Sequence, residues 1–193
     1  MNYRQTLLIA ISGTLLAGCA SLPEKYVPST VGPVQHQAAQ GQALECRIHS
    51  VHDAVVAGEP VEFVVLLRNR SDQAIWVPSR PDVVFLWTYS NGRRDNFMRD
   101  DPMPQFFTSH NAVLLQPGEQ LTRTVRVDTR NFLRNGVTEF RALVQAPTNL
   151  NPELNSFWTG RTVSNGYGVL VADRATVASH RATHHASLQQ ARP

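Results

Sequence analysis

The sequence has few cysteines and few lysines. Cys19 and Cys46 are the only cysteines among 193 residues, which excludes the disulfide-rich class of small exported domains. Lys25 is the single lysine, the net charge is only +3, and no dense cluster of basic residues occurs. These features argue against a nucleic-acid partner. No apolar run reaches the roughly 20 residues that a membrane-spanning helix requires.

The sequence also lacks the motifs of common catalytic sites. It contains no Gly-x-Ser-x-Gly elbow, no His-Glu-x-x-His pair and no phosphate-binding glycine loop. Ser109 and His110 are adjacent in sequence, but a catalytic serine needs a base that meets it in space and a third group that orients the base. We therefore predict a protein that is not an enzyme and has no cofactor.

Two groups of potential metal ligands are incomplete. The histidines His180, His184 and His185 have helical spacing, but residues 174–193 contain no acid or cysteine to complete a zinc site. Residues 91–101 contain Asp95, Asp100 and Asp101, but arginines separate them, whereas calcium loops place a glycine at the sharp turn. These patterns predict a solvated tail and a salt-bridged loop, and no metal site.

The N-terminal stretch has the composition of a secretory signal. Residues 1–5 are mostly polar and contain Arg4, residues 6–18 are mostly apolar, and the run ends in Leu16-Ala17-Gly18-Cys19. A short apolar run that ends in small residues is typical of a cleaved signal peptide and is too short to span a bilayer.

Leu16-Ala17-Gly18-Cys19 resembles the lipobox of bacterial lipoproteins. The resemblance implies that Leu16, Ala17 and Gly18 are the signal-peptidase recognition positions and that Cys19 carries acyl chains such as palmitate. Residue 20 is alanine, where retention in the inner membrane usually requires Asp, so the resemblance implies sorting to the outer membrane of a Gram-negative cell, on its periplasmic face. Several acyl chains anchor a protein stably without a spanning helix.

Composition divides the remaining chain into three parts. Residues 19–42 are rich in Pro, Gln and Ala, which predicts a flexible tether that averages roughly 25–30 Å and reaches about 75 Å when extended. Residues 43–173 have strand patterns throughout. Residues 174–193 lack acidic side chains and are predicted to be a disordered tail.

Alternating apolar residues predict strands in the central part. The strongest is 61–68, where Val61, Phe63, Val65 and Leu67 share one face, and a second is 82–89, where Val83, Phe85, Trp87 and Tyr89 do. Others are expected near 43–49, 74–78, 113–115, 121–127, 138–146 and 157–171. Seven to nine short strands in some 130 residues are typical of an all-β antiparallel sandwich.

Turn motifs in this region resemble those of bacterial immunoglobulin-like domains. They are Gly58-Glu59-Pro60-Val61, Pro117-Gly118-Glu119 and Gly136-Val137-Thr138-Glu139-Phe140. The resemblance implies an immunoglobulin-like β-sandwich, although the bridging cysteine pair of that fold is missing. A transthyretin-like sandwich is the alternative topology.

Several side chains within the predicted sandwich have an expected environment. With Cys19 acylated, Cys46 has no disulfide partner, and its place beside Leu44 and Ile48 predicts a buried free thiol. Trp76 and Trp87 are expected in the core and Trp158 at a half-exposed position.

Two loops supply the candidate partner contacts. Residues 91–111 break the strand pattern, and residues 147–160 begin with a polar loop; the candidate contact residues are Arg93, Arg94, Phe106, Phe107 and Trp158. The predicted function is non-catalytic binding of another envelope protein. The alternatives are a protease inhibitor that inserts loops into a cleft, and a glycan- or peptidoglycan-binding module that uses Trp158 and Tyr167. The sequence leaves the oligomeric state open.

The lipobox generates a direct prediction. Cys19→Ala removes the thiol that would carry the first acyl chain, so the domain should still fold but leave the outer-membrane fraction. Membrane fractionation with immunoblotting measures this, with Cys46→Ala as the matched control that should stay membrane-bound. Continued outer-membrane fractionation of the Cys19→Ala variant would contradict the anchor.

Overall fold

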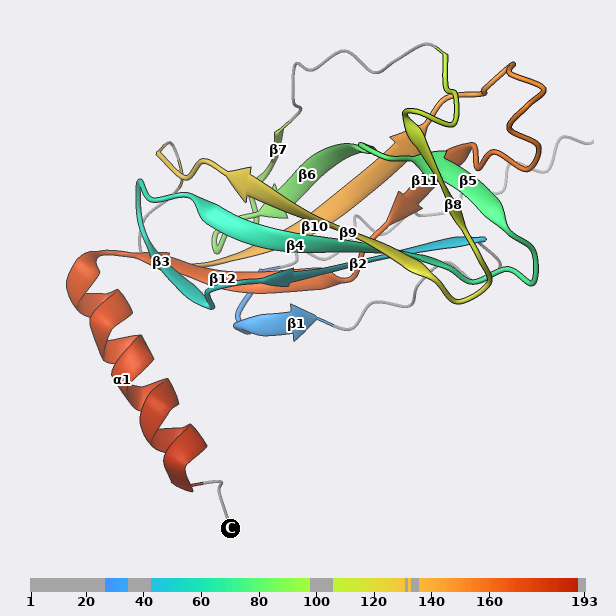
Figure 1. The fold of residues 1–193 in the computed structure, drawn as a ribbon. Helices are drawn as coiled ribbons and strands as arrows, with labels where there is room; N and C mark the ends of the chain where they lie inside the picture. The colour runs from blue at the N-terminus through green and yellow to red at the C-terminus, as the bar shows by residue number, and fades with distance from the viewer. Residues whose placement is uncertain (1–26, 35–42, 98–105, 131, 133–135, 191–193) are drawn as a thin grey trace, which may run out of the picture.

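A computed structural model describes residues 27–34, 43–97, 106–130, 132 and 136–190 (Figure 1). This part of the chain is an all-β sandwich of mainly antiparallel sheets, followed by one helix, so the predicted fold class is confirmed. The predicted signal peptide, with Leu16, Ala17, Gly18 and Cys19, lies outside the described residues. No helix in the described residues is long and apolar enough to cross a membrane.

The strands of the described residues form three sheets. The largest has the strand order β1-β12-β10-β6-β7, with β11 beside β10 and β3 beside β12. Its strands are β1 (Gly32–Val34), β3 (Ala54–Val56), β6 (Asp82–Thr88), β7 (Arg94–Phe97), β10 (Gly136–Ala146), β11 (Gly160–Val163) and β12 (Gly166–Ala172). The other sheets are β2-β4-β9 and β5-β8, with strands β2 (Leu44–Ser50), β4 (Val61–Asn69), β5 (Ile75–Pro78), β8 (Ala112–Leu115) and β9 (Gln120–Val127). The pairing of β3 with β12 is parallel.

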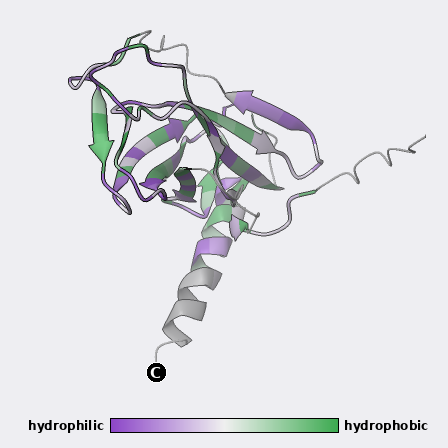
Figure 2. Ribbon diagram, turned by 90° about the vertical axis from the view of Figure 1, so that its right-hand side faces the viewer, coloured by the Kyte–Doolittle hydropathy of each residue, from purple (hydrophilic) through white to green (hydrophobic). Residues whose placement is uncertain are grey.

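The core lies between the largest sheet and the β2-β4-β9 sheet. Val61, Phe63, Val65 and Leu67 are all buried, which confirms the inward face predicted for β4. The Phe63 ring lies 4.9 Å from Phe85 and 4.8 Å from Phe140, so it joins β4 to both β6 and β10. Figure 2 shows hydrophobic and hydrophilic residues alternating along several strands, as expected where one face of each is buried.

Asn165 ties the two layers together at the break between β11 and β12. Its Oδ1 accepts a hydrogen bond from the Ile48 N–H at 2.9 Å, and its Nδ2 donates to the Ile48 carbonyl at 3.2 Å. The side chain thus satisfies both main-chain groups of one β2 residue, as a neighbouring strand would. The break between β11 and β12 at Asn165 therefore has a structural role.

The prediction that residues 19–42 are a flexible tether is wrong for residues 32–34, which form β1. This strand pairs antiparallel with β12, with Gly32 opposite Gly168. The pairing depends on main-chain groups and on close approach rather than on apolar side chains, so the composition of the segment gives no sign of it. A Cβ on Gly168 would lie 1.9 Å from the Thr30 carbonyl oxygen, which shows how closely the N-terminal segment approaches β12.

The prediction that residues 174–193 are a disordered tail is also wrong for residues 174–190. Residues 174–190 form helix α1 (Arg174–Gln190), which projects from the sandwich in Figure 1. Asp173 caps it, because its Oδ1 accepts a hydrogen bond from the Thr176 N–H at 2.8 Å, and this bond lowers the pKa of the Asp173 carboxyl. Val177 is buried against Ala54 and Ala172 and attaches the first turns to the sheet.

The prediction of a single loop over residues 91–111 is wrong for residues 94–97. A turn at Asn91-Gly92, in which the Gly92 N–H donates to the Tyr89 carbonyl at 2.8 Å, reverses the chain, and the next residues pair with β6 as the edge strand β7. Because β7 is short and three of its four residues are polar or charged, the sequence shows no strand pattern there. Together with β1 and β3, this strand raises the number above the predicted seven to nine.

Gly168→Ala should loosen β1 from the sheet. The added methyl group would clash with the Thr30 main chain, which cannot rotate away as a side chain would, so we expect a loss of about 1–3 kcal/mol in unfolding free energy. Urea denaturation measures that loss, and hydrogen exchange at residues 32–34 locates it. Thr88→Ala, on the same sheet, is the control. Unchanged exchange at residues 32–34 in the glycine variant would contradict the prediction.

Candidate functional site

The two loops predicted to contact a partner are joined at one end of the sandwich. Asn149 Oδ1 accepts a hydrogen bond from the Phe107 N–H at 3.3 Å, and Asn151 Nδ2 donates to the Phe107 carbonyl at 2.9 Å. The Asn151 side chain is buried, and its Oδ1 also accepts from the Glu153 N–H at 3.0 Å. These bonds hold residues 106–111 and 147–156 together, and we call this surface the loop cluster.

A cluster of aromatic side chains packs against the buried side of these loops. Phe107 is only 1% exposed, and its ring lies 4.8 Å from that of Phe157. Trp76 of β5 packs against the same cluster, and its carbonyl accepts a hydrogen bond from the Trp158 N–H at 2.8 Å. The loops thus rest on a small apolar core of their own, which fixes the side chains that point to solvent.

Two large apolar side chains of the loop cluster are exposed to solvent. Phe106 is 56% exposed and Leu150 is 84% exposed. The prediction that Phe107 contacts a partner is wrong, because Phe107 belongs to the supporting core, whereas Phe106 remains available. Sequence reasoning missed Leu150, although an apolar residue in an otherwise polar loop was a usable signal.

The candidate contacts Arg93 and Arg94 lie away from the loop cluster. Arg93 and Arg94 follow the β6–β7 turn, and Arg93 pairs with Asp95 at 3.6 Å, its guanidinium 5.9 Å from the centre of the Tyr89 ring. The salt-bridged loop is thus confirmed for Asp95, while Asp100 and Asp101 lie outside the described residues. Arg94 is exposed and lines a pocket on the outer face of the largest sheet.

The aromatic residues proposed for glycan stacking are not equally accessible. Tyr167 is buried, and its hydroxyl donates a hydrogen bond to Asp53 Oδ1 at 2.7 Å. Burial, and then the Asp53 carboxylate, raise the pKa of this phenol. Trp158 is half-buried against the main core, as predicted. A stacking platform made of Trp158 and Tyr167 is therefore wrong, because Tyr167 offers no free face.

The expected environments of the remaining side chains are mostly confirmed. Cys46 is a buried free thiol, and burial is the main cause that raises its pKa to about 12. Trp87 is buried in the core as predicted, whereas Trp76 is half-buried. His180 is half-buried on α1, and the described residues contain no group of three or more His, Cys, Asp or Glu that could hold a metal ion.

Comparisons with known proteins bear on the fold alone. No protein-family model matches the chain, and no curated protein matches it. Among solved structures, the chain is similar to a CARDB domain from Pyrococcus furiosus, crystallised with di-metal ions, at 17% identity over 76% of this chain and 100% of that one, with a TM-score of 0.36. It is also similar to the sporulation control protein Spo0M from Bacillus subtilis, at 10% identity over 71% of this chain and 52% of that one, with a TM-score of 0.39.

Asn151→Ala should separate the two loops of the loop cluster. The substitution leaves the buried Phe107 carbonyl without its donor, which should cost about 1–3 kcal/mol in unfolding free energy. Urea denaturation measures the loss, and hydrogen exchange over residues 106–111 and 147–156 should show where it occurs. Asn155→Ala, at an exposed position in the same loop, should change stability by less than about 0.5 kcal/mol. Equal effects of the two variants would contradict the role assigned to Asn151.

Proposed function

We propose that this chain is a non-catalytic lipoprotein, anchored through Cys19 on the periplasmic face of the outer membrane, whose sandwich binds another envelope protein. The loop cluster is the binding surface. The observation that supports this proposal is the exposure of Phe106 and Leu150 on two loops that Asn149 and Asn151 hold together.

The physical basis is the combination of exposed apolar area and fixed geometry. Apolar and aromatic side chains supply most of the binding energy at protein interfaces, and prior ordering of their loops reduces the entropy lost on binding. The aromatic cluster under Phe106 provides that order. Exposed apolar side chains on a rigid base are therefore better suited to a protein partner than to a highly polar ligand.

The protease-inhibitor alternative would use the same loop at 147–160. An inhibitor would use the same surface but would bind a protease, so an assay against cysteine and serine proteases distinguishes the inhibitor from the binder of an envelope protein. Inhibition by the purified chain that is lost with Leu150→Ser would favour the inhibitor.

Photo-crosslinking tests the envelope-protein proposal. A benzoylphenylalanine residue placed at position 106 or 150 in Gram-negative cells should give one discrete adduct with an envelope protein. The matched control is position 51, because Val51 is 47% exposed and lies beyond the end of β2, at the opposite end of the sandwich. A shared adduct from positions 106 and 150 that is absent from position 51 is the expected result.

The double variant Phe106→Ser with Leu150→Ser should weaken binding to the crosslinked protein by about 2 kcal/mol or more, because truncated interface anchors cost that much. Its urea denaturation curve should remain near that of the unaltered chain, since both side chains are exposed. Unaltered affinity, or an adduct formed only from position 51, would show that the loop cluster is not the interface.

A further inference from the structure

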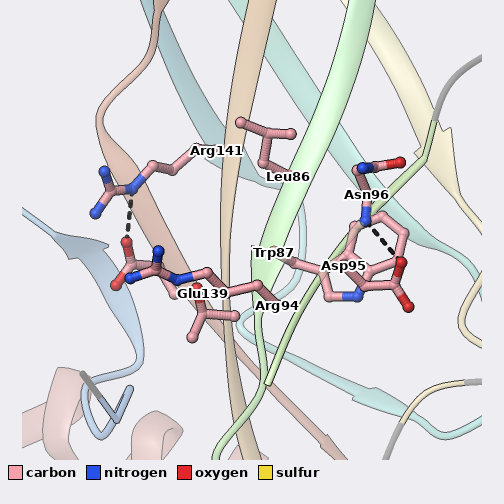
Figure 3. Close-up of a pocket in the computed structure, with 8 residues that line it drawn as sticks. Leu86, Trp87, Arg94, Asp95, Asn96, Glu139 and Arg141 are labelled. Atoms are coloured by element: carbon pink, nitrogen blue, oxygen red, sulfur yellow. Dashed lines mark hydrogen bonds and ion pairs between the residues drawn. The ribbon is translucent and has the colours of Figure 1, made fainter. Parts of the chain in front are cut away.

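A pocket of about 470 Å³ lies on the outer face of the largest sheet, on the strands β7, β6 and β10 (Figure 3). It is within the size range of pockets for small molecules. The register of the three strands places the lining residues in two rows. In the first row, Thr88 of β6 lies between Arg94 of β7 and Glu139 of β10. In the second row, Leu86 of β6 lies between Asn96 of β7 and Arg141 of β10. Side chains two residues apart on a strand share a face, so the two rows form one surface.

The Glu139–Arg141 pair forms one wall of this pocket. Glu139 is only 3% exposed although it points away from the main core, and its Oε1 accepts a hydrogen bond from Arg141 Nε at 2.9 Å. A carboxylate this buried is costly without a paired cation. The pair therefore contributes a fixed wall with little net charge.

Arg94 supplies the remaining positive charge from the opposite wall. Its exposed side chain extends across β6 toward Glu139 in Figure 3, and within the described part of the chain it forms no hydrogen bond or ion pair. Asp95, which also lines the pocket, is paired with Arg93. The pocket thus combines the exposed guanidinium of Arg94 with the apolar side chain of Leu86 and the polar groups of Thr88 and Asn96.

We propose that this pocket binds a small organic carboxylate, with Arg94 as the group that recognises it. A guanidinium matches a planar carboxylate with two parallel hydrogen bonds. Leu86 contacts the apolar part of the ligand, and Thr88 and Asn96 offer further hydrogen bonds. A single negative charge suits the site better than the double charge of a phosphate, because the Glu139 carboxylate lies in the same row as Arg94.

This proposal is independent of the loop cluster. β10 begins beside the pocket, with Glu139 and Arg141, and its last residue Ala146 leads into residues 147–156 of the loop cluster. The two sites therefore lie toward opposite ends of one strand, and loss of function at one leaves the other intact.

Saturation-transfer NMR with the full chain in detergent tests the pocket. The probes are N-acetylalanine and its C-terminal amide, which differ only in the carboxylate. The carboxylate should bind saturably and the amide should not. Arg94→Gln should raise the dissociation constant at least about tenfold, and Arg94→Lys should raise it several-fold because lysine lacks the planar fork.

Arg80→Gln is the matched control, since Arg80 is an exposed arginine before β6, at the far end of that strand from the pocket. It should bind the probe as the unaltered chain does. The proposal is overturned if the acid gives no saturable signal, if the amide binds equally well, or if Arg94→Gln retains affinity. Displacement of the probe by lower concentrations of inorganic phosphate than of acetate would also overturn the carboxylate assignment.

Discussion

The packing of Phe63 against Phe85 and Phe140 is the contact on which the rest of this fold depends. It lies where β4 of one layer meets β6 and β10 of the other, and all three rings are completely buried. This contact fixes which side chains of each strand point inward, because a shift of one residue in the strand pairing would move every apolar side chain to the outer face. The register that this core imposes also sets Arg94, Thr88 and Glu139 in one row on the far side of the sheet. The outer-face pocket is in this sense a consequence of core packing.

The inner faces of the sheets are buried in the core, so the loop ends and the outer faces are the surfaces left for binding. At the loop end, Asn151 and the ring of Phe107 order two segments that are some 40 residues apart in sequence, and this order leaves Phe106 exposed while Phe107 is buried. On the outer face, the burial of the Glu139 carboxylate costs desolvation free energy, which its ion pair with Arg141 offsets. The two surfaces differ in chemistry: one is apolar and suited to a protein, the other polar and suited to a small anion.

The sequence predicted those parts of the fold whose side chains alternate, and missed those held by main-chain or long-range contacts. The inward faces of β4 and β6 could be predicted because apolar residues recur at period 2. β1 could not, because its pairing depends on the room that Gly168 leaves for Thr30. α1 was missed although Asp173 is a good capping residue, since its attachment to the sheet depends on Val177 meeting Ala54 more than 100 residues earlier. The Glu139–Arg141 pair was missed because outward charged residues on a strand look the same whether solvent or another segment covers them.

The position of the N-terminal segment changes what the proposed anchor implies. Residues 27–34 belong to the sandwich, since β1 pairs with β12, and residues 35–42 connect two strands of one domain and add nothing to its reach. Only the eight steps from Cys19 to Val27 then separate the residue that the proposed anchor would acylate from the domain. Fully extended, they span roughly 26–29 Å, against the roughly 75 Å expected of a free tether. If Cys19 carries the proposed acyl chains, the sandwich would lie close to the bilayer, and the partner proposed for the loop cluster should be sought among membrane-embedded or membrane-proximal proteins rather than among proteins deeper in the periplasm.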